Sequence, residues 1–295
     1  MSEPRVRVLV VHMAPLEQLG GAELSLQHHV RHAPAEVAVE VIQPHQKADL
    51  TRFDAVVLGN LRPPGGVGEN RECEFAEQWL WRLGQYDGFV HHIEYDAHPC
   101  GHRDARCVEC PLIRKRACDC SPRIPEAFER LFNRCDAVQF VSPGQQQVIN
   151  AIIRVTCEQV VIATPIDLTP FQNRIPWHER RKEALIVGDA IRVADTAETL
   201  ATAHGYRPVR FPYLSIPYAK MPDLLNEYQA VVVDPVMYHS NPRIVVEAMA
   251  CGCKVLTGPR VGTMSWDDPI KAVLEANERF WSFLLSRISV IGCGI

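Results

Sequence analysis

Two hydrophobic patterns alternate along the chain, and together they predict an α/β protein. Residues 5–11 alternate in polarity and then become entirely apolar, which is typical of a strand buried in a parallel sheet. After a turn with two glycines, residues 22–32 carry apolar side chains at helical spacing, and Leu24, Leu26 and Val30 are expected to face inward. A strand followed by such a helix is the beginning of a βαβ unit.

The same alternation continues to residue 163 and predicts a first doubly wound domain, 1–163. It predicts further strands at 37–42, 53–58, 88–93, 137–141 and 160–162, and helices at 72–83, 126–134 and 145–153. Residues 164–177 show little periodicity and contain Pro165, Pro170 and Pro176, so they are predicted to form a linker.

A second α/β unit is predicted after this linker, and it defines a domain at 164–275. Its expected strands are 183–187, 209–212, 230–233 and 254–257, and its expected helices are 194–204, 220–228, 242–251 and 270–288. Ligands of open parallel sheets bind beyond the carboxyl ends of the strands, so a cleft between the two domains is the expected ligand site.

Composition narrows the class of protein. The chain has 295 residues, of which 47% are hydrophobic and 22% charged, as in ordinary globular proteins. Its net charge of -4 argues against nucleic-acid binding over the whole surface. No apolar run is long enough to span a bilayer, and residues 1–11 are predicted to be a strand rather than an export signal. A cytoplasmic protein is therefore expected, and its 11 cysteines are expected to be thiols or metal ligands.

Residues 98–123 form a Cys-rich insertion in the first domain. Its C-x-x-C and C-x-C pairs have the spacing of a tetrahedral zinc site. An ordered loop of this length is usually stabilised by a bound metal or a cross-link. A structural zinc ion is favoured, and an iron–sulfur cluster, disulfides and free thiols are the alternatives. The basic residues of this insertion could contact an anionic acceptor, and the alternative is that they lie on a solvated surface loop. The expected ligands are Cys107, Cys110, Cys118 and Cys120, with Cys100, His98 and His102 as alternates.

The segment HSNPRIVVEAMACGCKVLTG, residues 239–258, carries the most specific chemical signal. Pro242 favours the first turn of a helix, whose free N–H groups can hold a phosphate. Glu247 lies about one and a half turns further on, where a carboxylate can accept hydrogen bonds from ribose hydroxyls. The alternative is a capping or surface carboxylate.

This segment resembles the donor-binding signature of family 4 glycosyltransferases of the GT-B fold. Glu247 matches the second glutamate of that signature, which binds the nucleotide ribose, and His239 stands where the first glutamate is expected. Gly20 and Gly21 match the family's glycine-rich turn after the first strand, although a plain tight turn has the same sequence. The family's Lys-Gly pair after residue 188 is absent, so Arg192 or Arg243 would have to neutralise the diphosphate.

The resemblance implies two Rossmann-like domains that face each other across a cleft, with residues 276–295 as a C-terminal helix that packs back on the first domain. It implies a hexosyltransferase-type enzyme that uses a nucleotide diphosphate sugar, retains the anomeric configuration and needs no catalytic cofactor or metal. The acceptor stays open among glycan, lipid, protein and nucleic acid, as does the oligomeric state. The donor-binding candidates are Gly20, Gly21, Arg192, Asn241, Arg243 and Glu247, and the catalytic candidates are Asp96, His92, Glu94 and His239.

Three other functions remain compatible with these residues. A nucleotide-sugar epimerase of the GT-B type would bind the same donor without an acceptor. A zinc-dependent nucleic-acid-binding protein would use residues 98–123 and would bind with a steep salt dependence. A degenerate glycosyltransferase that only binds sugars would account for His239 and for the missing lysine.

Overall fold

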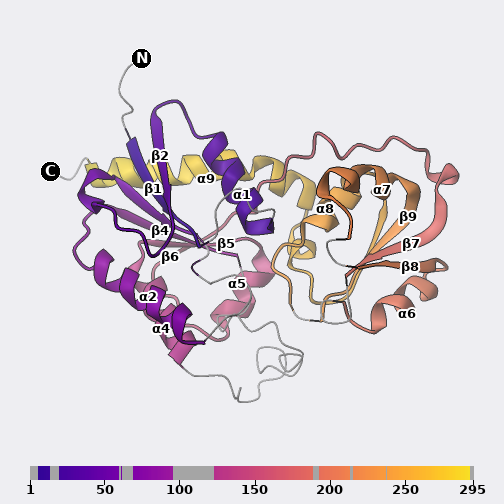
Figure 1. Ribbon diagram of the computed structural model, residues 1–295, viewed down its shortest axis with the longest axis horizontal. Helices are drawn as coiled ribbons and strands as arrows, with labels where there is room; N and C mark the ends of the chain where they lie inside the picture. The colour runs from indigo at the N-terminus through magenta and orange to yellow at the C-terminus, as the bar shows by residue number, and fades with distance from the viewer. Residues whose placement is uncertain are drawn as a thin grey trace.

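A computed structural model describes most of the chain. The described residues are 6–13, 20–59, 61, 69–95, 123–188, 193–212, 215–236 and 238–292, without the side chains of 69–74, 123–125 and 292. Figure 1 shows two lobes side by side, each built on one sheet, with the long C-terminal helix α9 (Pro269–Gly292) extending from the second lobe along the first.

The first lobe contains a parallel sheet of six strands in the order β2-β1-β3-β4-β5-β6. The strand order turns back on itself around β1, as in doubly wound folds. The strands are β1 (Val6–Val11), β2 (Val37–Ile42), β3 (Ala55–Leu58), β4 (Phe89–Glu94), β5 (Ala137–Phe140) and β6 (Glu158–Val161), and the helices are α1 (Gly21–Arg31), α2 (Glu69–Leu83), α4 (Arg123–Arg134) and α5 (Pro143–Asn150).

Alternate residues of the central strands supply two separate cores. Leu9 and Val11 face α2 and α4 and belong to the same cluster as Trp79. Val8 and Val10 face the opposite side, where they pack with residues of α1 and α9. Burial on both faces explains why these strands are continuously apolar in sequence.

The inward face of α1 differs from the expected one. Ser25, Leu26 and His29 are buried, whereas Leu24 and Val30 are only half-buried. The prediction was correct for Leu26, and it missed Ser25 and His29 because it considered only apolar side chains. Both buried polar residues have partners from distant parts of the chain: Arg243 donates to Ser25, and His29 lies against α9.

Helix α9 completes the core of the first lobe. Ala276, Phe280 and Leu284 are fully buried in the cluster that covers this face of the first sheet. The indole Nε1 of Trp281 donates to the carbonyl of His29, at 3.1 Å. Among the described residues, no helix is long and apolar enough to cross a membrane.

The second lobe contains a parallel sheet of four strands in the order β10-β9-β7-β8. One of its cores lies under α7 and α8, and the other lies under α6. Its strands are β7 (Arg181–Val187), β8 (Arg207–Phe211), β9 (Tyr228–Val233) and β10 (Lys254–Thr257), and its helices are α6 (Thr196–Ala203), α7 (Met221–Glu227) and α8 (Arg243–Ala250).

The chain between the two sheets is more buried than a linker is expected to be. Thr164 and Ile166 are both at least nine-tenths buried, and their segment lies between the start of α8 and the first lobe. Short 3₁₀ turns border the strands of both lobes: η1 (Leu50–Arg52), η3 (Trp177–Glu179), η4 (Tyr218–Lys220) and η5 (Gly262–Ser265).

Candidate functional site

The two lobes meet through elements that follow the carboxyl ends of their strands. From the first lobe, α1 follows β1 and α5 follows β5; from the second, α8 follows β9 and η5 follows β10. The Ser142 Oγ at the start of α5 donates to the Ser240 carbonyl at 2.7 Å, and the Gly144 N–H donates to Ser265 Oγ at 2.9 Å. The ligand site of this fold is therefore expected at the junction of the lobes.

Glu247 is buried at this junction, with only 2% of its surface exposed. It is on α8, and its Oε1 accepts a hydrogen bond of 2.6 Å from the Tyr218 hydroxyl. The Arg243 Nε lies 3.4 Å from the same oxygen, one helical turn earlier. The carboxylate predicted to bind ribose thus has one cationic and one phenolic partner.

Burial has the largest effect on the pKa of the Glu247 carboxyl group. It raises the pKa of Glu247, and Arg243 and Tyr218 only partly offset this effect. Burial and the neighbouring Glu247 likewise raise the pKa of Tyr218, so the phenol stays protonated and acts as the hydrogen-bond donor.

Arg243 joins four segments of the chain. Its Nη1 donates to Ser25 Oγ at 3.3 Å and to the Pro165 carbonyl at 3.4 Å, and its Nη2 donates to Tyr218 Oη at 3.1 Å. A side chain at Gly21 would start 3.6 Å from the Arg243 Cδ. The guanidinium therefore lies near the N-termini of both α1 and α8, a setting that favours anions.

Both polar atoms of the Asn241 side-chain amide form hydrogen bonds with other residues of the protein. Its Nδ2 donates to Thr164 Oγ1 at 2.6 Å, and its Oδ1 accepts from Thr263 Oγ1 at 2.7 Å. These contacts fix the loop before α8 to the inter-lobe segment. His239, two residues earlier, is exposed, and its backbone pairs with Arg260 and Gly262.

The structure also brings together a pair that the sequence interpretation did not include. His12 follows β1, and its Nε2 lies 3.1 Å from Glu23 Oε1 on α1. The Glu23 carboxylate folds back over Gly20 so closely that a Cβ there would be 1.9 Å from Oε2. A polar residue directly after an apolar strand, with a glutamate three residues after Gly20, was the available signal.

His92 and Glu94 lie on β4, and Glu94 is the last residue of that strand. They are 2% and 4% exposed, respectively, and the His92 ring packs 4.8 Å from that of Phe132 on α4. The His92 Nε2 is 3.6 Å from Glu94 Oε2. The His92 side chain therefore lies between β4 and α4, with the Glu94 carboxylate beside it.

Several predicted residues lie outside the described residues. They are Asp96, Arg192, the proposed ligands Cys107, Cys110, Cys118 and Cys120, and the alternates His98, Cys100 and His102. Within the described ranges, no group of three or more His, Cys, Asp or Glu side chains could hold a metal ion.

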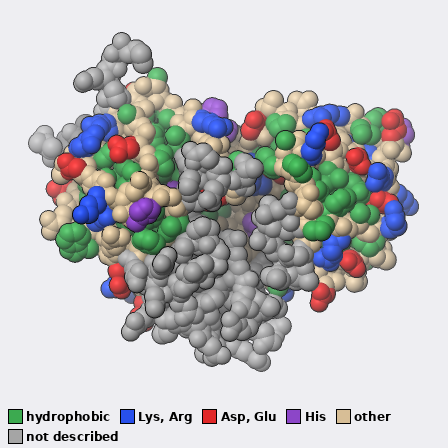
Figure 2. Space-filling view, viewed as in Figure 1, with side chains coloured by type: hydrophobic (Ala, Val, Ile, Leu, Met, Phe, Trp, Pro, Cys, Tyr) green, Lys and Arg blue, Asp and Glu red, His purple; other side chains and the backbone are tan. Residues whose placement is uncertain are grey.

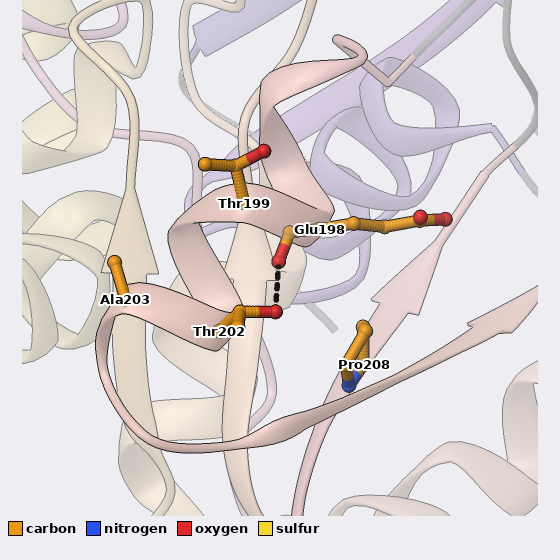
Figure 3. Close-up of a pocket in the computed structure, with 5 residues that line it drawn as sticks. All are labelled: Glu198, Thr199, Thr202, Ala203 and Pro208. Carbon is orange, nitrogen blue, oxygen red and sulfur yellow. Dashed lines mark hydrogen bonds between the residues drawn. The ribbon is translucent and has the colours of Figure 1, made fainter.

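An open hollow on the second lobe is distinct from this junction (Figure 3). It lies between α6 and β8, and none of the candidate site residues lines it; the lining residues are Glu198, Thr199, Thr202, Ala203 and Pro208. On the face shown in Figure 2, acidic and basic side chains are interspersed over both lobes.

Comparisons with known proteins identify the fold. No protein-family model and no curated protein sequence matches the chain. Sucrose-phosphate synthase (tll1590) from Thermosynechococcus elongatus matches with a TM-score of 0.60 at 10% identity, over 97% of this chain and 92% of the other. Anabaena Alr3699/HepE in complex with UDP-glucose matches with a TM-score of 0.55 at 12% identity, over 97% of both chains.

The fold is therefore that of GT-B glycosyltransferases, as the sequence predicted. The N-terminal domain of Candida albicans trehalose-6-phosphate phosphatase shares it as well, with a TM-score of 0.54 at 10% identity over 97% of this chain and 96% of that one.

Proposed function

We propose that the protein is a glycosyltransferase that moves a sugar from a nucleotide diphosphate sugar to an acceptor. Glu247 is the observation that carries this proposal. It is a buried carboxylate one turn into a helix whose N-terminus meets the other lobe, in a GT-B fold. The structural neighbour Alr3699/HepE has been crystallised with UDP and with UDP-glucose, which supports a donor of this chemical class.

The diphosphate of the donor is assigned to the space around Arg243 and the N-termini of α1 and α8. Departure of the diphosphate builds negative charge, and prearranged N–H groups and a cation stabilise that charge without reorganising. Arg243, rather than the lysine usual in the resembling family, then supplies the positive charge, with Arg192 as a second candidate. We further propose transfer with retention and without a catalytic metal, by a hexosyltransferase-type reaction.

The acceptor is assigned to the first lobe. Asp96 is the proposed catalytic group there, and His92 and Glu94, which are buried on the strand before it, are the other candidates. His239 is exposed at the edge of the lobe junction and is the proposed contact to the donor sugar.

Calorimetric titration with UDP-, GDP- and ADP-sugars tests this proposal. At least one should bind, and Glu247→Ala should weaken that binding by well over about tenfold, because hydrogen bonds to a charged group are lost. Glu198→Ala is the matched control, since Glu198 is an exposed carboxylate on the same lobe. If no nucleotide sugar binds, or if Glu247→Ala binds as well as the wild type, the proposed donor site is wrong. Product analysis with donor alone separates transfer from epimerisation, which needs no acceptor.

A further inference from the structure

We infer that Tyr218 competes with the donor ribose for Glu247, so that its phenol acts as a gate on the nucleotide site. This inference rests on the proposed function and deepens it. The Tyr218 hydroxyl donates to Glu247 Oε1 at 2.6 Å, which is the hydrogen bond that a ribose hydroxyl is proposed to make. A protein hydroxyl thus takes the place of a ligand hydroxyl.

The competition follows from how fully Glu247 Oε1 is engaged. A carboxylate oxygen offers two lone pairs, and the Tyr218 hydroxyl and the Arg243 guanidinium both approach this one. Only 3% of the Glu247 side chain is exposed. A ribose hydroxyl therefore reaches Oε1 only if one of the two partners moves.

Moving Tyr218 away from Glu247 should require less free energy than moving Arg243. Arg243 is tied to Ser25 on the first lobe and to the Pro165 carbonyl, so its displacement would break contacts between lobes. Tyr218 lies on the three-residue turn η4, is only half-buried, and packs its ring 5.8 Å from that of Phe171. Its hydroxyl makes its two hydrogen bonds within this cluster, to Glu247 and from Arg243.

The gate sets both affinity and selectivity. The apparent dissociation constant equals the intrinsic constant divided by the fraction of molecules in which Tyr218 has left Glu247. A nucleotide with ribose hydroxyls regains the lost hydrogen bond when it displaces the phenol. A 2′,3′-dideoxy nucleotide regains nothing, so the gate discriminates against it.

The test uses calorimetric titration of the full chain with UDP, GDP and ADP. Tyr218→Phe keeps the ring and removes the competing hydroxyl, so it should bind the nucleotides that the wild type binds roughly three- to tenfold more tightly. The same variant should unfold at a lower temperature without nucleotide, because Glu247 loses a donor. Tyr206→Phe, on the same lobe with its ring against Lys254, should change neither quantity.

The outcomes separate the gate from the proposed function. Wild-type binding that Tyr218→Phe weakens or leaves unchanged would overturn the inference about Tyr218 and leave the donor site standing. Such a result would mean that the phenol holds the nucleotide or only supports the fold. Failure of both proteins to bind any of the three nucleotides would overturn the proposed function, and the gate with it.

Discussion

Arg243 and Ser25 form a hydrogen bond between helices of different lobes, with the guanidinium Nη1 3.3 Å from the serine Oγ. Ser25 in turn donates to the Gly21 carbonyl at 2.8 Å. The glycine turn, α1 and α8 are thereby linked through one side chain. An anion bound at either helix N-terminus is expected to meet the same guanidinium, which makes Arg243 the first residue to test.

Replacing Arg243 should reduce affinity for diphosphates more than for monophosphates. Charge-assisted hydrogen bonds to a second phosphate are lost, so Arg243→Met should weaken binding of the best nucleoside diphosphate by at least about tenfold. Because Glu247 also loses its cation, the free energy of unfolding should fall by about 2 kcal/mol. Calorimetry and chemical denaturation measure the two effects.

The control for this variant is Arg174→Met. Arg174 is an exposed arginine of the second lobe, paired with Asp223 at 2.8 Å. Equal losses of monophosphate and diphosphate affinity in Arg243→Met would mean that the guanidinium does not contact the second phosphate.

Asn241→Ala should affect stability more than nucleotide binding. Both of its polar ends are bonded to threonines of the protein, and truncation leaves these two buried hydroxyls without partners. The free energy of unfolding should fall by about 2–3 kcal/mol in urea denaturation, since each orphaned group costs about 1 kcal/mol or more. A large loss of nucleotide affinity with unchanged stability would instead support the donor contact predicted from sequence.

Two buried histidines should make the protein sensitive to mild acid. Burial lowers the pKa of His29 to about 3 and that of His91 to about 4, from 6.5. The unfolded chain takes up protons near pH 6.5 that the folded chain does not, so their contribution to stability is complete above pH 6.5 and is lost as the pH falls toward 4 and 3. Each histidine should cost about 1.4 kcal/mol per pH unit in this window.

Denaturation curves at pH 7.5, 6 and 5 measure this slope. His29→Gln and His91→Gln should each make it shallower by about one proton. Identical slopes in the wild type and both variants would show that the two histidines take up protons in the folded state as they do in the unfolded chain.

Arg180 is expected to be a structural residue of the second lobe. It is 5% exposed and donates to the Ile175 carbonyl, Asn173 Oδ1 and the Cys251 carbonyl, at 2.8, 2.6 and 2.7 Å. Arg180→Met leaves these acceptors unpaired and should destabilise the protein by about 3 kcal/mol or more. Arg181→Met, one residue on at an exposed pair with Glu227, should cost under about 1 kcal/mol in the same urea titration.

The Cys-rich insertion is predicted to bind about one zinc ion per chain. Elemental analysis of protein purified without chelator should detect it, and Cys107→Ser or Cys118→Ser should remove most of it. Cys157→Ser is the control, because burial raises the pKa of this half-buried thiol to about 11 and makes it a poor ligand. Metal-free protein whose cysteines titrate as disulfides would refute the zinc site.

Secondary structure was predictable because local pattern and burial agree along the chain. The strand at residues 37–42 and the one at 254–257 have the predicted bounds. The glycine after α8, Gly252, has a φ of +79° that stops the helix where its sequence suggested.

The polar contacts of the site were not predictable in the same way. Glu247 was recognisable from its own segment, but its partner Tyr218 lies 29 residues earlier, on a turn with no helical or strand pattern. His29 and Ser25 are buried because α9 and Arg243 reach α1 from more than two hundred residues away. A periodicity analysis compares near neighbours, so it assigns such residues to the surface.

The position of α9 has a consequence for biosynthesis. One side of the first sheet, including Val8, Val10 and Ile93, is covered in part by Phe280 and Leu284, which are translated after both sheets. The amino-terminal half therefore emerges from the ribosome with an apolar surface that is exposed to solvent until α9 packs against it. Folding of this chain is expected to finish after translation, and the intervening period is when a chaperone would be most useful.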